Sequence, residues 1–324
     1  MYVDDLLITG NSKKQIDLFA DKLKEEFEMT NLGEMKYFLG IEVEQTENGI
    51  FISQKKYASD ILKRFKMQQC KPVDTPVALN TKLSKEDGDQ PINEKEYRSL
   101  VGSLLYLTAT RPDLMFAASL LSRFMSKPSQ THFGVAKRVL RYIKGTINHG
   151  IYFAGGVGSN LIGYSDSDWA GSVDDMKSTS GYLFTLGSGP FCWNSKKQEV
   201  VAQSTAEAEY IASSSAVNHA VWLRKILNDL AKSQDDPTTI MVDNQSAIAV
   251  AKNAVDHGRT KPIKVKFHAI RQAEKEGEVH LQYCPGESQI ADMFTKALPK
   301  SRFEDLRLKI GVLPKSFKEE NVDY

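Results

Sequence analysis

The sequence predicts an α/β protein whose larger part is a mixed five-stranded sheet with flanking helices. Three short runs rich in β-branched and aromatic residues, at residues 161–166, 179–186 and 189–194, are typical of consecutive antiparallel strands. Two further strand patterns, at residues 238–243 and 279–283, alternate with helical patterns, which favours a βαβ extension of the same sheet. A smaller α+β region precedes this part of the chain.

The first residues predict a β-hairpin whose first strand would precede Met1. Asp4 and Asp5 follow Tyr2-Val3, and the apolar residues 6–8 come next. Two adjacent carboxylates at a tight turn can hold divalent cations against a nucleoside triphosphate. An ordinary solvated Asp-Asp turn is the alternative.

The rest of the N-terminal region also mixes helix and strand. Ser12 can cap a helix that carries its apolar residues on one face. Asn48-Gly49 lies between two strand patterns and is a strong hairpin signal. We expect a helix over residues 12–29, a hairpin of residues 35–43 and 49–52, and a helix over residues 54–65.

A helical region separates the two sheets of the prediction. Residues from Glu94 have helical apolar spacing, and two more helices are expected over residues 113–125 and 131–144. The last of these helices carries a basic stripe, which can track a phosphate backbone or be an ordinary solvated face. The stripe consists of Lys137, Arg138, Arg141 and Lys144.

Helices and a charged tail complete the C-terminal part. We expect a long helix over residues 205–230, shorter helices near residues 245–253, 262–276 and 288–298, and a last amphipathic turn after residue 301. The predicted organisation is residues 1–79, a polar linker at 80–93, a helical connection at 94–147, the main domain at 148–312 and a flexible tail at 313–324.

Composition sets broad limits on function. The chain has 324 residues with Lys+Arg 42 against Asp+Glu 41, a formal net charge of +1, so no global field indicates a polyanionic partner. A bound divalent metal can still supply the charge that a phosphate needs. Cys70, Cys192 and Cys284 fit neither a disulfide framework nor a zinc site, which favours a reducing compartment. We expect an intracellular protein, cytoplasmic or nuclear, with no membrane partner.

Four acidic residues stand where a metal site on an α/β sheet would need them. Asp166 ends a strand, Asp243 ends another, Glu209 lies in the long helix and Asp292 lies in the last helix. Burying a carboxylate without a partner is costly, so such residues cap, pair or bind metal. The four residues are therefore candidate metal ligands and candidate catalytic residues.

Three rival assignments remain open at this point. Glu207 competes with Glu209, because it is two residues away and points to another helix face. Asp168 competes with Asp166, but alternation places Asp166 on the same face of the sheet as Tyr164, and Asp168 lies beyond the end of the expected strand. The alternative role for Asp243 is the N-cap of the helix that starts near residue 245.

The order of the motifs resembles the C-terminal part of a copia-type retrotransposon polyprotein, over nearly the whole chain. Each motif alone is weak, whereas their succession is highly specific. The motifs are Tyr2-Val3-Asp4-Asp5, Leu39-Gly40-Ile41-Glu42-Val43, Tyr97-Arg98-Ser99-Leu100-Val101-Gly102, Thr110-Arg111-Pro112-Asp113, Tyr164-Ser165-Asp166-Ser167-Asp168-Trp169, Lys177-Ser178-Thr179-Ser180-Gly181-Tyr182, Ala206-Glu207-Ala208-Glu209-Tyr210 and Ala291-Asp292-Met293-Phe294-Thr295-Lys296.

This resemblance implies a ribonuclease H-like domain preceded by a truncated reverse transcriptase palm. It implies that Asp166, Glu209, Asp243 and Asp292 hold two Mg²⁺ ions roughly 4 Å apart, with Mn²⁺ as a substitute, and that the RNA strand of an RNA–DNA hybrid is hydrolysed. Asp4 and Asp5 would be a vestigial polymerase turn, so no DNA synthesis is expected. Other parts of the polyprotein would be partners if they are expressed.

The sequence departs from the family at one place and leaves two rival functions. Many ribonucleases H carry a histidine before the final acidic helix, whereas residues 284–288 contain none and His280 is interpreted as structural. A catalytically silent relic that at most binds nucleic acid is one rival, and a different nuclease or an integrase on the same fold is the other. We also expect a fragment that starts near Asn148 to be more soluble than the whole chain, because the apolar residues 6–8 would form an unpaired edge.

Overall fold

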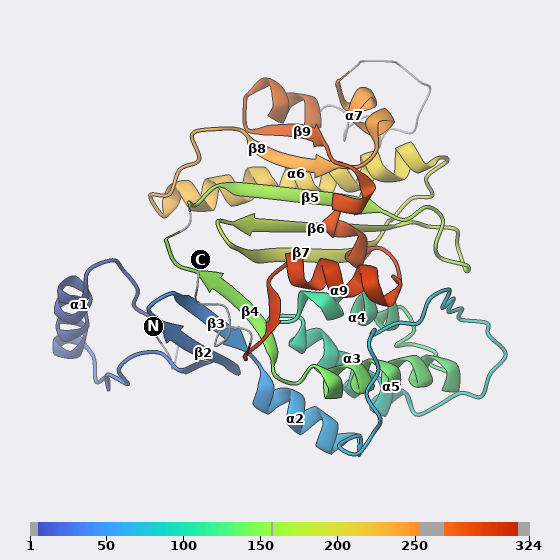
Figure 1. Cartoon of the computed structure of the whole chain (residues 1–324), viewed down its shortest axis with the longest axis horizontal. Coiled ribbons are helices and arrows are strands. Elements are labelled where there is room, and N and C mark those ends of the chain that lie inside the picture. Colours follow the sequence, from blue (N-terminus) through green and yellow to red (C-terminus); the bar gives the residue numbers. More distant parts are fainter. Residues whose placement is uncertain (1–5, 157, 253–268, 317–324) are drawn as a thin grey trace.

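The computed structural model describes residues 6–156, 158–252 and 269–316 and contains two five-stranded sheets joined by helices (Figure 1). The fold is mixed α/β, as the sequence predicts. Among the described residues, no helix is long and apolar enough to span a membrane.

The first sheet is antiparallel and has the strand order β1-β2-β3-β4-β10. The predicted hairpin turn is confirmed, with Thr46 paired to Gly49, but the strand expected over residues 35–43 is divided, with residues 37–38 and 41–46 forming two paired strands. A side chain at Gly49 would lie 2.1 Å from the carbonyl oxygen of Phe153, so this turn requires glycine. The strands are β1 (Tyr37–Phe38), β2 (Ile41–Thr46), β3 (Gly49–Ser53), β4 (His149–Ala154) and β10 (Val312–Pro314).

Two strands of this sheet were not predicted. Strand β4 lies where no strand was expected, at the start of the predicted main domain, and β10 lies mostly in the expected flexible tail, residues 313–324. Both are short, and their neighbours in the sheet are distant in sequence. Strand β4 and the first residue of β10 lie within residues 148–312, the predicted main domain, but both strands belong to the N-terminal sheet.

The N-terminal expectations are met only in part. Helix α1 (Lys13–Glu26) is capped by Ser12 as predicted, but it ends earlier and none of its residues is buried. The predicted strand at residues 6–8 is wrong, because these residues form no regular structure. Asp4 and Asp5 lie outside the described residues.

The helical connection forms as predicted, with one division. Asn93 caps α3 (Glu94–Leu107), and a capping box starts α5 (Gln130–Gly145). The helix expected over residues 113–125 is instead a 3₁₀ turn, η1 (Pro112–Leu114), followed by α4 (Met115–Ser122). Helix α2 (Lys55–Arg64) precedes them.

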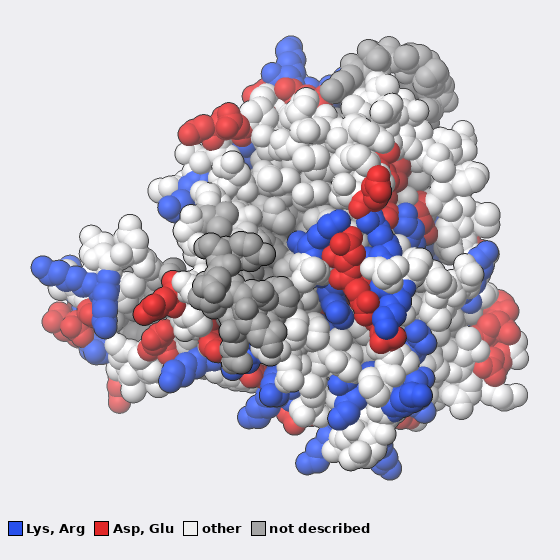
Figure 2. All heavy atoms as spheres, in the orientation of Figure 1, with Lys and Arg blue, Asp and Glu red and all other residues white. Residues whose placement is uncertain are grey.

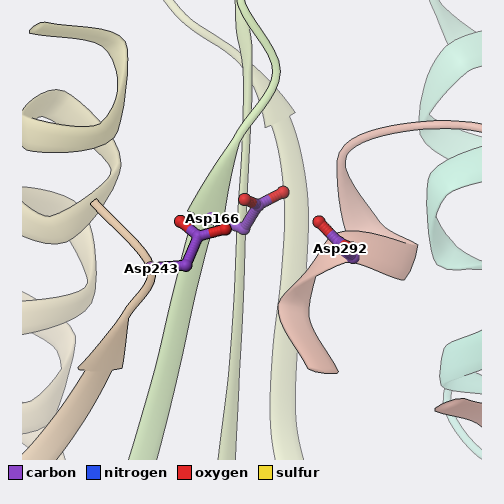
Figure 3. A group of neighbouring side chains, drawn as sticks. All are labelled: Asp166, Asp243 and Asp292. Atoms are coloured by element: carbon purple, nitrogen blue, oxygen red, sulfur yellow. The ribbon is translucent and has the colours of Figure 1, made fainter. Parts of the chain in front are cut away.

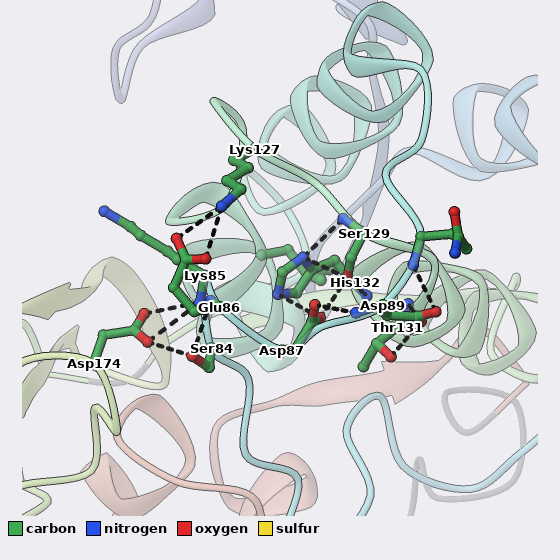
Figure 4. Close-up of polar contacts among 12 residues, drawn as sticks. Ser84, Lys85, Glu86, Asp87, Asp89, Lys127, Ser129, Thr131, His132 and Asp174 are labelled. Carbon is green, nitrogen blue, oxygen red and sulfur yellow. Dashed lines mark hydrogen bonds and ion pairs between the residues drawn. The ribbon is translucent and has the colours of Figure 1, made fainter.

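The polar residues 80–93 form no helix, as expected of a linker, but they are fastened at both sides (Figure 4). Asp174 accepts hydrogen bonds from the Ser84 hydroxyl and the Lys85 amide. The Ser129 hydroxyl, at the start of α5, donates to Asp87 at 2.5 Å. This segment therefore ties the helical connection to the loop that follows β5.

The second sheet has the order β7-β6-β5-β8-β9, with the first three strands antiparallel and the last two parallel to β5. This is the predicted mixed sheet with its βαβ extension. The strands are β5 (Leu161–Ser167), β6 (Thr179–Leu186), β7 (Gly189–Lys197), β8 (Thr238–Val242) and β9 (Val279–Tyr283).

Helices cover both faces of this second sheet. Phe184 of β6 packs in a cluster with α6 (Thr205–Asp229), while its neighbour Leu183 packs in the cluster of the connecting helices. Because successive side chains of a strand point to opposite faces, the connection covers one face and α6 the other. The expectation that a fragment starting near Asn148 would be more soluble is therefore not supported, since it would uncover Leu183.

The C-terminal segment also differs from the prediction. The helix expected over residues 288–298 is two 3₁₀ turns, η2 (Gly286–Ser288) and η3 (Ile290–Phe294), followed by α9 (Lys300–Lys309). The segment η3 is buried against both the sheet and the connecting helices. Helix α7 (Gln245–Lys252) is confirmed. Of the helix expected over residues 262–276, residues 269–275 are helical and residues 262–268 lie outside the described residues.

Candidate active site

Three aspartates meet at one edge of the second sheet (Figure 3). Asp166 lies near the end of β5, Asp243 directly follows β8, and Asp292 lies in η3. One carboxylate oxygen of each residue lies within 4.8 Å of those of the other two. Strands β5 and β8 are parallel neighbours, so their carboxyl ends bring the first two aspartates to the same edge.

Glu209 lies near Asp166 and Asp243 but is not one of the residues whose carboxylate oxygens all lie within 4.8 Å of one another. Its Oε1 accepts the N–H of Ser167 at 3.0 Å, and its buried Oε2 has no hydrogen-bond partner. Burial, followed by the nearby charges of Asp166 and Asp243, raises the pKa of Glu209 far above its ordinary value. The helix thus presents this carboxyl group to the aspartates, as the helical phase predicts.

The rival acidic residues are engaged in local structure. The Glu207 carboxylate accepts the N–H of Gln203 at 2.9 Å, and its own N–H donates to Ser204, which closes the start of α6. Asp168 accepts the backbone N–H of Thr179 and lies outside the three-aspartate group. Both residues therefore have structural contacts that do not involve the aspartates.

The alternative role for Asp243 is filled by its neighbour. The side-chain oxygen of Asn244 accepts the N–H of Ala247 at 3.0 Å, so Asn244 caps α7. Asp243 is half-buried, and burial together with the charge of Asp292 raises its pKa. Its carboxylate is thus left facing the other two aspartates.

Two basic side chains and a hydroxyl contact the aspartates, and sequence reasoning assigned none of them a role. The Lys296 ammonium lies 2.6 Å from Asp292 Oδ1, and the Arg302 guanidinium lies 3.4 Å from Asp292 Oδ2. The Thr295 hydroxyl donates to Asp166. The sequence does indicate the contact of Lys296, because this residue follows Asp292 by four positions in the motif Ala291–Lys296.

The site carries more negative than positive charge in a buried setting. Burial is the largest cause that raises the pKa of Asp166 to about 6; the charges of Asp292 and Asp243 add to it and Lys296 opposes it. Carboxylate oxygens are the ligands that Mg²⁺ prefers, and Glu209 has one buried oxygen without a partner. The donor set therefore fits a divalent metal.

Charges around the site are mixed in sign. Figure 2 shows basic and acidic side chains interspersed on the face that carries α9. Ion pairs account for several of them, among them Lys300 with Asp74 and Lys309 with Asp305. This face thus has no broad basic field, in keeping with the net charge of +1.

The basic stripe on α5 is partly structural. Arg138 donates to the Thr75 hydroxyl, and Arg141 donates to the carbonyl oxygen of Lys71. The Lys137 ammonium lies 4.5 Å from the centre of the Phe133 ring. Two of the four side chains thus hold the segment after α2, which weakens the phosphate-track interpretation.

The loop without a histidine is held by an arginine. Arg302 donates to the carbonyl oxygens of Gly286, Glu287 and Gln289. His280 is an exposed residue of β9 and does not lie in this loop.

Comparison with known proteins gives the family. A family model described as "Reverse transcriptase (RNA-dependent DNA polymerase)" matches residues 1–79. The Pol polyprotein from transposon RE1 of Arabidopsis thaliana is 40% identical over 312 residues, which is 96% of this chain and 21% of that protein. The uncharacterized mitochondrial protein AtMg00810 of the same plant is 39% identical over 222 residues, 68% of this chain and 92% of that protein.

Among solved structures, LC11-RNase H1 in complex with an RNA/DNA hybrid matches with a TM-score of 0.32 and 16% identity, covering 42% of this chain and 94% of that one. The chain spans about a fifth of the length of the RE1 polyprotein that it matches. The identity extends over nearly the whole chain, and the order of the motifs agrees with it. The chain therefore belongs to the Pol polyproteins of copia-type retrotransposons.

Proposed function

We propose that this chain is a ribonuclease H that hydrolyses the RNA strand of an RNA–DNA hybrid. The observation that carries the proposal is the convergence of Asp166, Asp243 and Asp292, from three separate segments, within 4.8 Å. Packing alone gives no reason to gather three carboxylates at a buried edge, since each raises the cost of ionising the others. Glu209 supplies a fourth carboxylate with one oxygen unpartnered.

The four carboxylates would hold two Mg²⁺ ions. Bound there, the ions would lower the pKa of a water and neutralise charge on the leaving oxygen. Ser167 orients Glu209 through its N–H, and Thr295 orients Asp166 through its hydroxyl. Lys296 places a positive charge at the same edge, where a substrate phosphate would come close to the carboxylates.

The substrate proposal rests on the family and on the chemistry of the site. Membership in the Pol polyproteins supports a nucleic acid hybrid as the substrate of this chain. A cluster of carboxylates that binds two metal ions is suited to the hydrolysis of phosphodiester bonds. Recognition of the 2′-hydroxyl across the shallow minor groove would distinguish RNA from DNA.

The test is cleavage of a duplex whose RNA strand carries an end label. The purified chain should cut this RNA with Mg²⁺ present, stop when EDTA is added, and leave the same sequence intact in a DNA duplex. Mutation of Asp243 to Asn should abolish the cutting. Binding of the hybrid without cleavage by the unmutated chain would instead support a silent, nucleic acid-binding relic.

A further inference from the structure

Two buried glutamines lie on either side of the carboxylates. Gln289 immediately precedes η3 and is 0% exposed, and Gln198 immediately follows β7 and is 6% exposed. Buried side-chain amides are kept where they satisfy backbone groups that the regular structure leaves unpaired. Most partners of these two amides lie one or two residues from an acidic residue in sequence.

Gln289 joins the three segments that carry the aspartates. Its Nε2 donates to the carbonyl oxygen of Ser165 at 2.9 Å and to that of Met241 at 3.3 Å. Its Oε1 accepts the N–H of Ala291 at 3.1 Å. Ser165 precedes Asp166, Ala291 precedes Asp292, and Met241 is two residues before Asp243.

The Gln289 hydrogen bonds lie where the backbone pairing between β5 and β8 ends. The pairing of β5 with β8 ends at Tyr164 and Met241, so the aspartates lie beyond the last paired residues. Past that point the ladder no longer fixes the separation of the two strands. The Gln289 amide bridges them at the place where their backbone pairing stops.

Gln198 connects the segments around Glu209. Its Nε2 lies within hydrogen-bond distance of the Ser167 hydroxyl at 3.1 Å, the Ser180 hydroxyl at 2.9 Å and the Ala208 carbonyl oxygen at 3.0 Å. Ala208 precedes Glu209 in α6, and the N–H of Ser167 is the donor to Glu209. One amide thus connects the end of β5, its neighbour β6 and the helix that carries the fourth carboxylate.

We infer that Gln198 and Gln289 are positioning residues that together set the spacing of the four carboxylates, and through it the affinity of the site for divalent metal. The hydrogen bonds of both side chains reach groups one or two residues from an acidic residue, so each acts through the chain next to a carboxylate. The inference rests on the proposed function in one respect, which is that the carboxylates bind metal. Residues that orient metal ligands commonly change metal affinity by about 10- to 100-fold when they are replaced.

The experiment compares Gln289→Met, Gln198→Met and Gln234→Met in the whole chain. Gln234 is the matched control, because its Nε2 donates to Ser159 O at 3.0 Å and its Oε1 accepts the N–H of Leu161 at 2.8 Å, at the opposite end of β5. Mn²⁺ affinity is measured by calorimetry without substrate. We expect roughly tenfold or greater weakening for the first two variants and none for the control. Affinities equal to that of the unmutated chain would overturn the inference.

A second measurement needs no metal and separates the two proposals. Hydrogen exchange in EDTA should show faster exchange of the Ala291 amide in Q289M and of the Ser167 amide in Q198M, with both amides unchanged in Q234M. Unchanged exchange at both amides would overturn the inference whether or not metal binds. If the unmutated chain binds no Mn²⁺, the proposed function fails, and amide exchange alone then decides the positioning role. Should Q289M not fold, Gln289→Asn, which keeps the amide but shortens its reach, is measured in its place.

Discussion

Replacing Asp166 by Asn should stabilise the metal-free protein while removing its response to metal. Asp166 is 1% exposed, and its folded-state pKa is raised from 3.8 to about 6, with burial as the largest cause. Ionised Asp166 therefore opposes folding unless a cation is bound. An asparagine amide can still accept the Thr295 hydrogen bond with its oxygen, and its nitrogen can donate to the neighbouring carboxylates.

The magnitude follows from the pKa difference. Well below pH 3.8 the carboxyl group is protonated in both states, so it costs nothing. As the pH rises from about 4 to about 6, the unfolded state releases its proton first, and stability falls with pH because the folded state binds more protons. Above pH 6 the full penalty applies, which for this difference is about 3 kcal/mol. Asn at this position should recover up to that amount at pH 8.

The assay is urea unfolding of the unmutated chain and of Asp166→Asn at several pH values between 4 and 8, in EDTA. We expect the two proteins to be similar at pH 4 and the mutant to be the more stable one at pH 8. Mn²⁺ added at pH 8 should stabilise the unmutated chain and leave the mutant nearly unchanged. A mutant that is less stable in EDTA at pH 8, or a difference that does not vary with pH, would refute the reasoning.

Three further predictions follow from the same site and core. Asp243→Asn should lower RNA cleavage at least about a hundredfold, since it removes a metal ligand, with unfolding curves that show an intact fold. Lys296→Gln should strengthen Mn²⁺ binding roughly fivefold in calorimetry, because it removes an ammonium 2.6 Å from Asp292, whereas Lys300→Gln should change nothing. A fragment of residues 148–324 should be less soluble than the whole chain on centrifugation after expression, because it exposes the sheet face that the connecting helices cover; equal solubility would contradict this.

The order of elements and the identity of the acidic residues were within reach of the sequence. The cap at Ser12 and the turn at Asn48-Gly49 are local signals, and each gave a correct element. The expected end of the strand also separates Asp166 from Asp168 without coordinates, and the helical phase separates Glu209 from Glu207. These features depend on residues close in the chain, which is why a sequence can carry them.

Tertiary structure decided what depends on distant partners. Strand β4 became a strand because β3 and β10 flank it, and η3 became a 3₁₀ turn because the sheet and the connecting helices bury it from two sides. Local patterns are silent on such contacts, since short strands gain their stability from pairing. The same holds for Gln198 and Gln289, whose amides matter only because folding brings Ser167, Met241 and Ala208 within hydrogen-bond distance. The sequence by itself thus determined which carboxylates are available, and the fold determined how close they come and what holds them there.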